Sequence, residues 1–137
     1  MLWIREKLVA LGLEDVVSHV LIQTAYANAS SGRFLESKNI PRVIVPTGVK
    51  YATPEQKKYT IGANCEPNGH GTILVDWNKL EEALDTIFDR EDINAKKLRA
   101  FLKIPSQTVG DGIANILMME AVMRDMDLSQ KYVQELY

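Results

Sequence analysis

The amino-acid sequence predicts an α/β fold, a single layered domain with a mixed, mainly four-stranded sheet flanked by helices. The length of 137 residues fits one domain that buries its own core. Short β-branched runs alternate with helical patterns in the first half, and the second half is helical throughout. No linker-like stretch divides the chain, so we expect one domain over residues 1–137.

The first elements follow from hydrophobic spacing. Apolar residues separated by charged ones predict a helix over residues 2–11 that ends near Gly12. Residues 16–27 form a β-branched and apolar run with little alternation, which predicts a strand covered on both faces. Ser30 is an N-cap candidate for the short helix that follows, and residues 43–45 are the second predicted strand.

A helix and two further strands are predicted next. Thr53 in the N-cap position, with Pro54 at the first helical position, predicts a short helix. Residues 59–63 and 72–75 are the third and fourth predicted strands. Between them, the polar and glycine-punctuated stretch 64–71 is predicted to be a loop.

The rest of the chain shows helical periodicity. Asp76 and Ser129 are suitable N-caps for the first and the last of these helices. Helices are predicted in four regions, residues 76–88, 98–102, 113–122 and 129–136.

Charge and composition exclude several classes of function. Lys and Arg number 16 against 18 Asp and Glu, a net charge of −2, so the basic surplus of a nucleic-acid binder is missing. No run approaches the roughly 18 apolar residues of a membrane span. Charged residues interrupt the apolar stretch at the start of the sequence, so no signal-peptide core is predicted. The lone Cys65 excludes an intrachain disulfide framework and favours a reducing, cytoplasmic location.

The loop at residues 66–72 is the most informative segment for function. Glu66, Asn68 and His70 alternate with other residues, and Gly69 and Gly71 follow the last two. A carboxylate can accept hydrogen bonds from two hydroxyls, an amide can both donate and accept, and glycines let the backbone approach a ligand. The segment suits a sugar-binding loop. An ordinary solvated turn between strands fits the pattern equally well.

A second candidate segment follows the strand at residues 43–45. Thr47, Gly48 and Lys50 follow a predicted strand, and ligands of open α/β sheets favour the crevice beyond the carboxyl ends of the strands. Lys50 can meet an anionic group as a compact charge. A turn with a surface lysine is the commoner explanation, and the glycine spacing of a Walker A loop is absent.

Other polar residues are assigned structural roles. Residues 23–31 fit a strand-to-helix connection better than a ligand loop. Asp111 is expected to cap a helix. His19 lies in an apolar run and is expected to be a hydrogen-bonded core residue. Glu66 beside Cys65 would raise the thiol pKa, which argues against a nucleophile. No metal site and no catalytic residue are predicted.

The four segments together resemble a known family. Residues 23–28, 47–50, 66–72 and 110–122 are similar to segments of the phosphoacetylglucosamine mutases, a branch of the α-D-phosphohexomutase superfamily. The resemblance covers essentially the whole chain. It implies four domains in the parent enzyme, of which this chain resembles only the third, sugar-binding one. The family's phosphoserine, magnesium and phosphate-binding loops are not found in this sequence.

The resemblance also implies what the parent enzyme does and needs. Such enzymes interconvert N-acetylglucosamine 6-phosphate and 1-phosphate on the route to UDP-N-acetylglucosamine. Mg²⁺ and a sugar 1,6-bisphosphate activator are expected for the parent, and no cofactor is expected in this chain. The expected partners are a sugar phosphate and the other domains of the parent. This chain is expected to be inactive alone.

Carried over residue by residue, the resemblance places the substrate-binding residues in two loops. One loop holds Glu66, Pro67, Asn68, Gly69 and His70, and the other holds Thr47, Gly48 and Lys50. The family usually has Ala where Pro67 stands, and proline removes a backbone donor and stiffens the loop. An alternative from another class is a stand-alone binding or interaction module that shares the fold.

Overall fold

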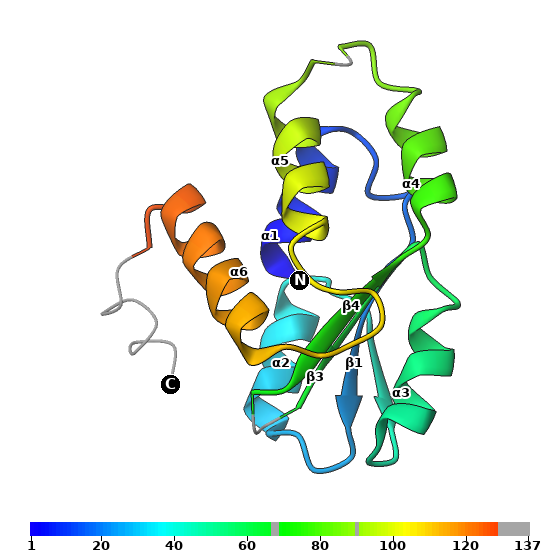
Figure 1. Cartoon of the computed structure of the whole chain (residues 1–137), viewed down its shortest axis with the longest axis vertical. Coiled ribbons are helices and arrows are strands. Elements are labelled where there is room, and N and C mark those ends of the chain that lie inside the picture. The colour runs from blue at the N-terminus through cyan, green and yellow to red at the C-terminus, as the bar shows by residue number, and fades with distance from the viewer. Residues whose placement is uncertain (67–68, 90, 129–137) are drawn as a thin grey trace.

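A computed structural model of the chain describes residues 1–66, 69–89 and 91–128. It has an α/β architecture with a four-stranded mixed sheet and flanking helices, as the sequence predicts (Figure 1). The helices and strands in chain order are α1 (Leu2–Ala10), β1 (His19–Thr24), α2 (Ala29–Ser37), β2 (Arg42–Val45), α3 (Val49–Gln56), β3 (Ile61–Cys65), β4 (Gly71–Val75), α4 (Trp77–Leu84), α5 (Ile93–Leu102) and α6 (Gly112–Asp125).

The sheet has the strand order β2-β1-β3-β4. β1 pairs in parallel with β2 and with β3, and β4 runs antiparallel to β3. The carboxyl ends of β1, β2 and β3 therefore meet at one edge, the lower end of the sheet in Figure 1. We call this the carboxyl edge. The segments after Thr24, Val45 and Cys65 all leave the sheet there.

Helices cover both faces of the sheet. Since neighbouring strand residues point to opposite faces, Ile61 and Gly62 define the two sides. Gly62 faces α3, and the smaller core on that side contains Val20, Ile22, Val45 and Ala52. Ile61 belongs to the main core with side chains of α1, α4 and α5, including Ile4, Leu8, Leu80, Leu84, Leu98 and Leu102.

Gln56 joins α3 to the sheet. Its side chain is buried, and its Nε2 atom donates to the carbonyl oxygen of Gly62 at 2.9 Å. The same amide reaches the carbonyl and the hydroxyl of Thr72 on β4, at 3.2 and 3.1 Å. These bonds fix the position of α3 relative to β3 and β4, and so the course of the chain at the carboxyl edge.

Several predicted boundaries differ from the structure. The strand predicted over 16–27 is shorter, at His19–Thr24, because turns occupy both ends of the apolar run. The helix predicted over 76–88 ends at Leu84. The loop predicted over 64–71 is shorter too, because Asn64, Cys65 and Gly71 belong to strands. The helix predicted from Ser129 lies outside the described residues.

The predicted start of α3 was wrong. α3 begins at Val49 with Gly48 as N-cap, and Pro54 lies inside the helix and not at its first position. Gly48 has a φ of 122°, which favours glycine, so the chain turns directly from β2 into the helix. Pro54 removes one backbone hydrogen bond of α3. For α2, the cap is Asn28, whose side chain accepts from Ser30 N, and not Ser30.

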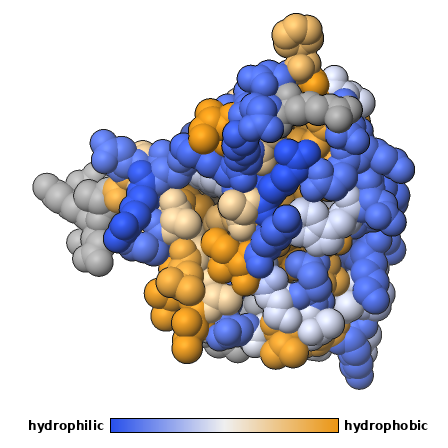
Figure 2. Space-filling model, turned by 45° about the horizontal axis from the view of Figure 1, so that its top comes forward, coloured by the Kyte–Doolittle hydropathy of each residue, from blue (hydrophilic) through white to orange (hydrophobic). Residues whose placement is uncertain are grey.

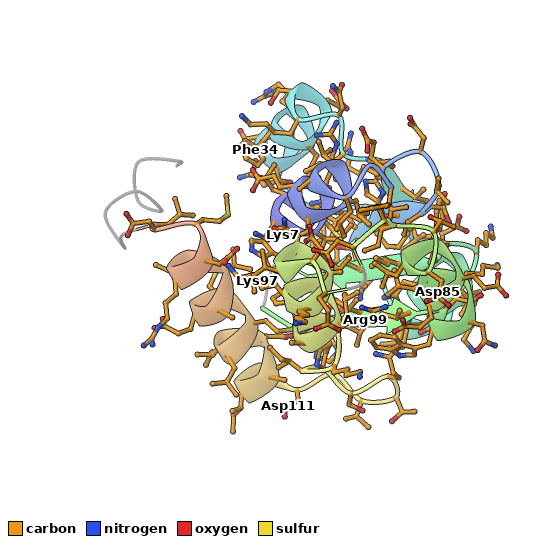
Figure 3. The ribbon with its side chains drawn as sticks, turned by 90° about the horizontal axis from the view of Figure 1, so that it is seen from above. Lys7, Phe34, Asp85, Lys97, Arg99 and Asp111 are labelled. Atoms are coloured by element: carbon orange, nitrogen blue, oxygen red, sulfur yellow. The ribbon has the colours of Figure 1, made fainter. Side chains whose placement is uncertain are left out.

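Asp125 anchors the end of α6 to the main core. Its carboxylate accepts from Trp3 Nε1 at 2.7 Å and lies 2.6 Å from the ammonium of Lys7, both on α1. Lys97 of α5 donates to the other carboxylate oxygen. Figure 3 shows Lys7 and Lys97 between α1, α5 and α6. Hydrogen bonds from Lys7, Lys97 and Trp3 hold the pKa of Asp125 well below its usual range.

This anchor predicts a pH dependence of stability. A carboxyl whose pKa is lowered by folding stabilises the fold above its unfolded pKa of about 4, and that contribution is lost as the pH falls further. We expect Asp125→Asn to lower the free energy of unfolding at neutral pH by about 2 kcal/mol. Urea unfolding at neutral pH and at about pH 3 should show a smaller acid loss in the variant than in the wild type.

The matched control for this prediction is Asp127→Asn, two residues further along. Asp127 is exposed and has a φ of 52°, which Asn accepts readily. The control should keep the acid sensitivity of the wild type. Equal pH dependence in Asp125→Asn and the wild type would contradict the assignment.

One side of α6 is apolar and uncovered. Ile113 and Ile116 are each 70% exposed, and Leu117 and Met119 are more than half exposed. Figure 2 shows apolar side chains gathered on this side of the molecule. Only Ala114 and Met118 of the helix are buried among the described residues. In the described part of the chain, no helix has the length and apolar character that crossing a membrane requires.

Candidate functional site

The carboxyl edge brings together the segments singled out in the sequence. Because Gln23 pairs with Cys65 and Thr24 with Val45, the chain leaves β1, β2 and β3 at the same level. β1 lies between the other two strands, so the segments after β2 and β3 start two strand spacings apart, about 10 Å. Ligands of open α/β sheets bind at such an edge.

The loop between β3 and β4 is held by its own backbone. Glu66 N donates to the carbonyl of His70 at 2.9 Å, and Gly69 N donates to the carbonyl of Glu66 at 3.0 Å. Gly69 has a φ of 85°, a conformation that glycine adopts without strain. Glu66 and His70 are half-buried and Gly69 is exposed. Pro67 and Asn68, two of the predicted substrate-binding residues, lie outside the described residues.

The second predicted loop leads from β2 into α3. Thr47 is exposed, Gly48 is the N-cap, and Lys50 lies in the first turn of the helix. The Lys50 ammonium lies over the ring of Tyr51, 5.0 Å from the ring centre. This segment thus presents an exposed positive charge near the carboxyl edge, on the β2 side of β1.

Polar side chains are buried at the end of β1 and in the neighbouring strand β3. Gln23 donates through Nε2 to Ser31 Oγ at 3.0 Å, which ties β1 to α2. In the described part of the chain, Gln23 Oε1, Thr24 Oγ1 and Asn64 Oδ1 are buried without a hydrogen-bond partner. Buried polar atoms are usually paired, so three unpaired ones near one edge are unusual. Asn64, in β3, was not predicted as a site residue. Asn is uncommon in buried strands, and that is the signal that could have identified it.

The segment at the start of α6, distant in the sequence, contacts the β3–β4 loop at the carboxyl edge. Asn115 of α6 donates to carbonyl oxygens of the β3–β4 loop, and a Cβ atom on Gly110 would lie 2.1 Å from the ring of His70. The segment before α6 therefore lies against the loop. As predicted, Asp111 caps α6 by accepting from Ile113 N. The packing role of this segment has no sequence signal.

Other chemistry finds little support at this edge. Burial raises the pKa of the Cys65 thiol, the N-terminal ammonium opposes the rise, and Glu66 adds to it. His19 lies at the opposite end of β1. It is a buried, hydrogen-bonded residue, as predicted: its Nδ1 atom lies 3.1 Å from the carbonyl oxygen of Val17, and its Nε2 atom has no partner among the described residues. Among the described residues, no group of three or more His, Cys, Asp or Glu side chains is placed to hold a metal ion.

A hollow lies elsewhere, between the end of α1 and the segment that joins α4 to α5. Among the described residues, its lining includes none of the predicted site residues. Its lining consists of Ala10, Leu11, Ile87, Phe88, Asp89 and Asp92.

Comparison with known proteins gives a consistent result. Residues 1–128 match the family model of phosphoacetylglucosamine mutase AMG1, domain III. The chain is 37% identical over 138 residues to a phosphoacetylglucosamine mutase of Oryza sativa subsp. japonica, with 90% of this chain and 25% of the relative covered. It is 32% identical over 139 residues to the enzyme of Homo sapiens, with 98% of this chain and 25% of the relative covered.

Solved structures agree with the sequence relatives. The structure of N-acetylphosphoglucosamine mutase from Aspergillus fumigatus superposes with a TM-score of 0.87 at 27% identity, over 99% of this chain and 26% of that one. A structure of the Aspergillus fumigatus enzyme in complex with GlcNAc-6P and magnesium superposes with a TM-score of 0.86 at 27% identity, over 98% of this chain and 28% of that one.

The match covers only part of each relative's length. The chain spans about a quarter of the length of the curated relatives it matches. The matched family model is that of a single domain, and it covers all of the described residues. The chain belongs to the phosphoacetylglucosamine mutase family and corresponds to domain III of those enzymes.

Proposed function

We propose that this chain is the sugar-recognition domain of a four-domain phosphoacetylglucosamine mutase. The parent enzyme interconverts N-acetylglucosamine 6-phosphate and 1-phosphate for UDP-N-acetylglucosamine synthesis. The observation that carries the proposal is the position of the Glu66 loop at the carboxyl edge of the sheet, in a chain that matches domain III. A related enzyme of Aspergillus fumigatus has been solved with GlcNAc-6P and magnesium, which supports the substrate class.

In this proposal Glu66 and Asn68 orient the sugar and transfer no proton. A carboxylate accepts from two neighbouring hydroxyls, and an amide both donates and accepts. A mutase must present either end of the sugar to one phosphoryl donor, so the sugar has to bind in two orientations. Hydrogen bonds to ring hydroxyls suit both orientations better than contacts to one fixed phosphate. Gly69 and His70 belong to the same loop.

Lys50 is proposed to meet the negative charge of the substrate. Its ammonium is exposed near the carboxyl edge, and Thr47 and Gly48 precede it in the turn from β2. A lysine acts on phosphate as a point charge and needs no fixed geometry. This loop would therefore approach whichever end of the sugar phosphate points toward β2.

The remaining parts of the reaction are assigned to other domains of the parent. Phosphoryl transfer depends on positioning and on charge neutralisation. Among the described residues, no group of three or more His, Cys, Asp or Glu side chains is placed to hold Mg²⁺. The phosphoserine, the metal and the sugar 1,6-bisphosphate activator belong to the proposed parent enzyme. The uncovered apolar side of α6 fits contact with those other domains, and the single thiol fits the cytoplasm.

The proposal can be tested on this chain by NMR. Titration with N-acetylglucosamine 6-phosphate should shift the amide signals of Glu66, Gly69, His70 and Gly71. Inorganic phosphate alone should leave these signals in place and move at most those near Lys50. Glu66→Ala should remove the sugar-induced shifts, whereas Glu82→Ala, at an exposed position of α4, should keep them. Absence of any shift in the wild type at tens of millimolar sugar phosphate would refute the proposal.

A second expected outcome concerns activity. We expect this chain alone to show no turnover of N-acetylglucosamine 6-phosphate, even with Mg²⁺ and a sugar 1,6-bisphosphate, because it lacks the phosphoryl donor. The assay is a coupled measurement of the 1-phosphate, with a full-length mutase as positive control. Turnover above the background of the buffer would contradict the assignment of chemistry to other domains.

A further inference from the structure

We propose that Asn115 is a positioning residue for the sugar-binding loop, which it braces from α6. The inference rests on the proposed function, since it gives Asn115 a part in ordering the loop that contacts the sugar. Asn115 lies in the first turn of α6, more than forty residues after the loop.

The contacts join one amide to two points of the loop. Asn115 Nδ2 lies 3.2 Å from the carbonyl oxygen of Gly69 and 3.5 Å from that of Gly71. Both contacted atoms are carbonyl oxygens, so the amide nitrogen and not its oxygen must face them. The two carbonyls flank His70. One side chain therefore spans the part of the loop that returns to β4.

This part of the loop needs support from outside. Gly69 and Gly71 both lack a side chain, and glycine loses more backbone freedom on ordering than any other residue. Among the described residues of the loop, the backbone supplies two hydrogen bonds, both involving Glu66. The Asn115 amide adds restraint at the opposite side, and so limits the positions from which the Glu66 carboxylate can face a ligand.

Gly110 provides a second point of support from the same segment. A Cβ atom at Gly110 would lie 2.1 Å from His70 Cε1 and 2.6 Å from His70 Nε2. The imidazole thus lies directly against the backbone of Gly110, in space that any side chain would fill. Residues 110–115 therefore contact His70 and donate hydrogen bonds on either side of it. We call this segment the template of the loop.

The template is itself fixed to the core. Ala114 and Met118 of α6 are buried, and Asp125 at its far end is anchored by Lys7, Lys97 and Trp3. α6 therefore carries Asn115 on a helix that is held at both ends. A brace on a rigid element orders a loop better than one on another loop.

The first test measures amide hydrogen-exchange rates of the ligand-free chain by NMR. Asn115→Ala should speed exchange at Glu66 and Gly69 by about tenfold, the value of one lost hydrogen bond. Asn115→Leu, which keeps the shape but not the donor, should do the same. Asn78→Ala, at an exposed position of α4, is the matched control and should leave the loop unchanged. The thermal midpoint of all three variants should stay close to that of the wild type, because alanine and leucine favour helices.

The second test replaces the glycines. Gly110→Ala should displace His70 and shift the loop signals, whereas Gly112→Ala, where a Cβ meets nothing within 4 Å, should not. Sugar-induced shifts should weaken in both Asn115 variants and in Gly110→Ala, and should be kept in Asn78→Ala and Gly112→Ala. Loop exchange identical to the wild type in both Asn115 variants would overturn the inference. If the wild type shows no sugar-induced shifts, the proposed function is refuted. The amide hydrogen-exchange rates of the loop would still decide whether Asn115 orders it.

Discussion

Replacing Glu66 by alanine in a full-length mutase that carries this domain is expected to lower kcat/KM for N-acetylglucosamine 6-phosphate by about a hundredfold. The carboxylate would lose hydrogen bonds to sugar hydroxyls, and a bond to a charged group contributes about 1.5–3 kcal/mol. Most of the change should appear in KM, because the sugar is held by the same residue before and during phosphoryl transfer. Steady-state kinetics in both directions would measure it.

The control for this prediction is Glu82→Ala, on an exposed face of α4 far from the carboxyl edge. Asn68→Ala should act in the same direction as Glu66→Ala. A loss confined to kcat, with KM unchanged, would point to proton transfer by Glu66. Unchanged kinetics in both loop variants would remove the loop from the substrate site altogether.

The second large effect is expected at Gly62, where β3 touches α3. A Cβ atom there would lie 2.5 Å from the carbonyl oxygen and 2.7 Å from the Cα of Gln56. Backbone atoms cannot rotate away as a side-chain tip can, so α3 would have to move off the sheet. We expect Gly62→Val to lower the free energy of unfolding by about 3 kcal/mol or more, the upper range for overpacking.

Urea unfolding followed by circular dichroism would measure this loss. Movement of α3 would also break the bonds from Gln56 to Gly62 and Thr72, so the signals of these residues should shift in NMR spectra. Gly112→Val is the matched control, because the space around Gly112 is open. A change below about 1 kcal/mol in Gly62→Val would show that α3 is not seated as described.

Much of the fold could be predicted because its signals are local. The β-branched runs that became β1 to β4 and the helical spacing of α4 to α6 are written in neighbouring residues. Boundaries failed where a long-range partner decides them. Thr53 and Pro54 are typical of a helix N-terminus, but α3 begins earlier, at Val49. Gly48 is its N-cap, and the hydrogen bond from Gln56 to Gly62 of β3 holds the helix on the sheet.

The site divides in the same way. The position of Glu66 and Lys50 beside the carboxyl edge could be predicted, because polar residues with glycines follow predicted strands. The contacts of Asn115 and Gly110 could not be predicted, because their partners lie far away in the sequence. Gly69 and Gly71 are 46 and 44 positions from Asn115, and His70 is 40 positions from Gly110. On its own, an asparagine in an apolar helix predicts only a solvent-facing position. The fold alone brings it to the loop.

The three chain segments at the carboxyl edge are connected differently. Those after β1 and β2 lead into α2 and α3, whereas the segment after β3 returns at once to β4 as a hairpin. A change of length after β1 or β2 would move a helix and its share of the core. A change of length in the hairpin reroutes no helix, provided that Gly69, His70 and Gly71 keep their contacts with Gly110 and Asn115. Under the proposed function, loop grafting for altered sugar preference should therefore begin in the hairpin and leave the strand-to-helix turns intact.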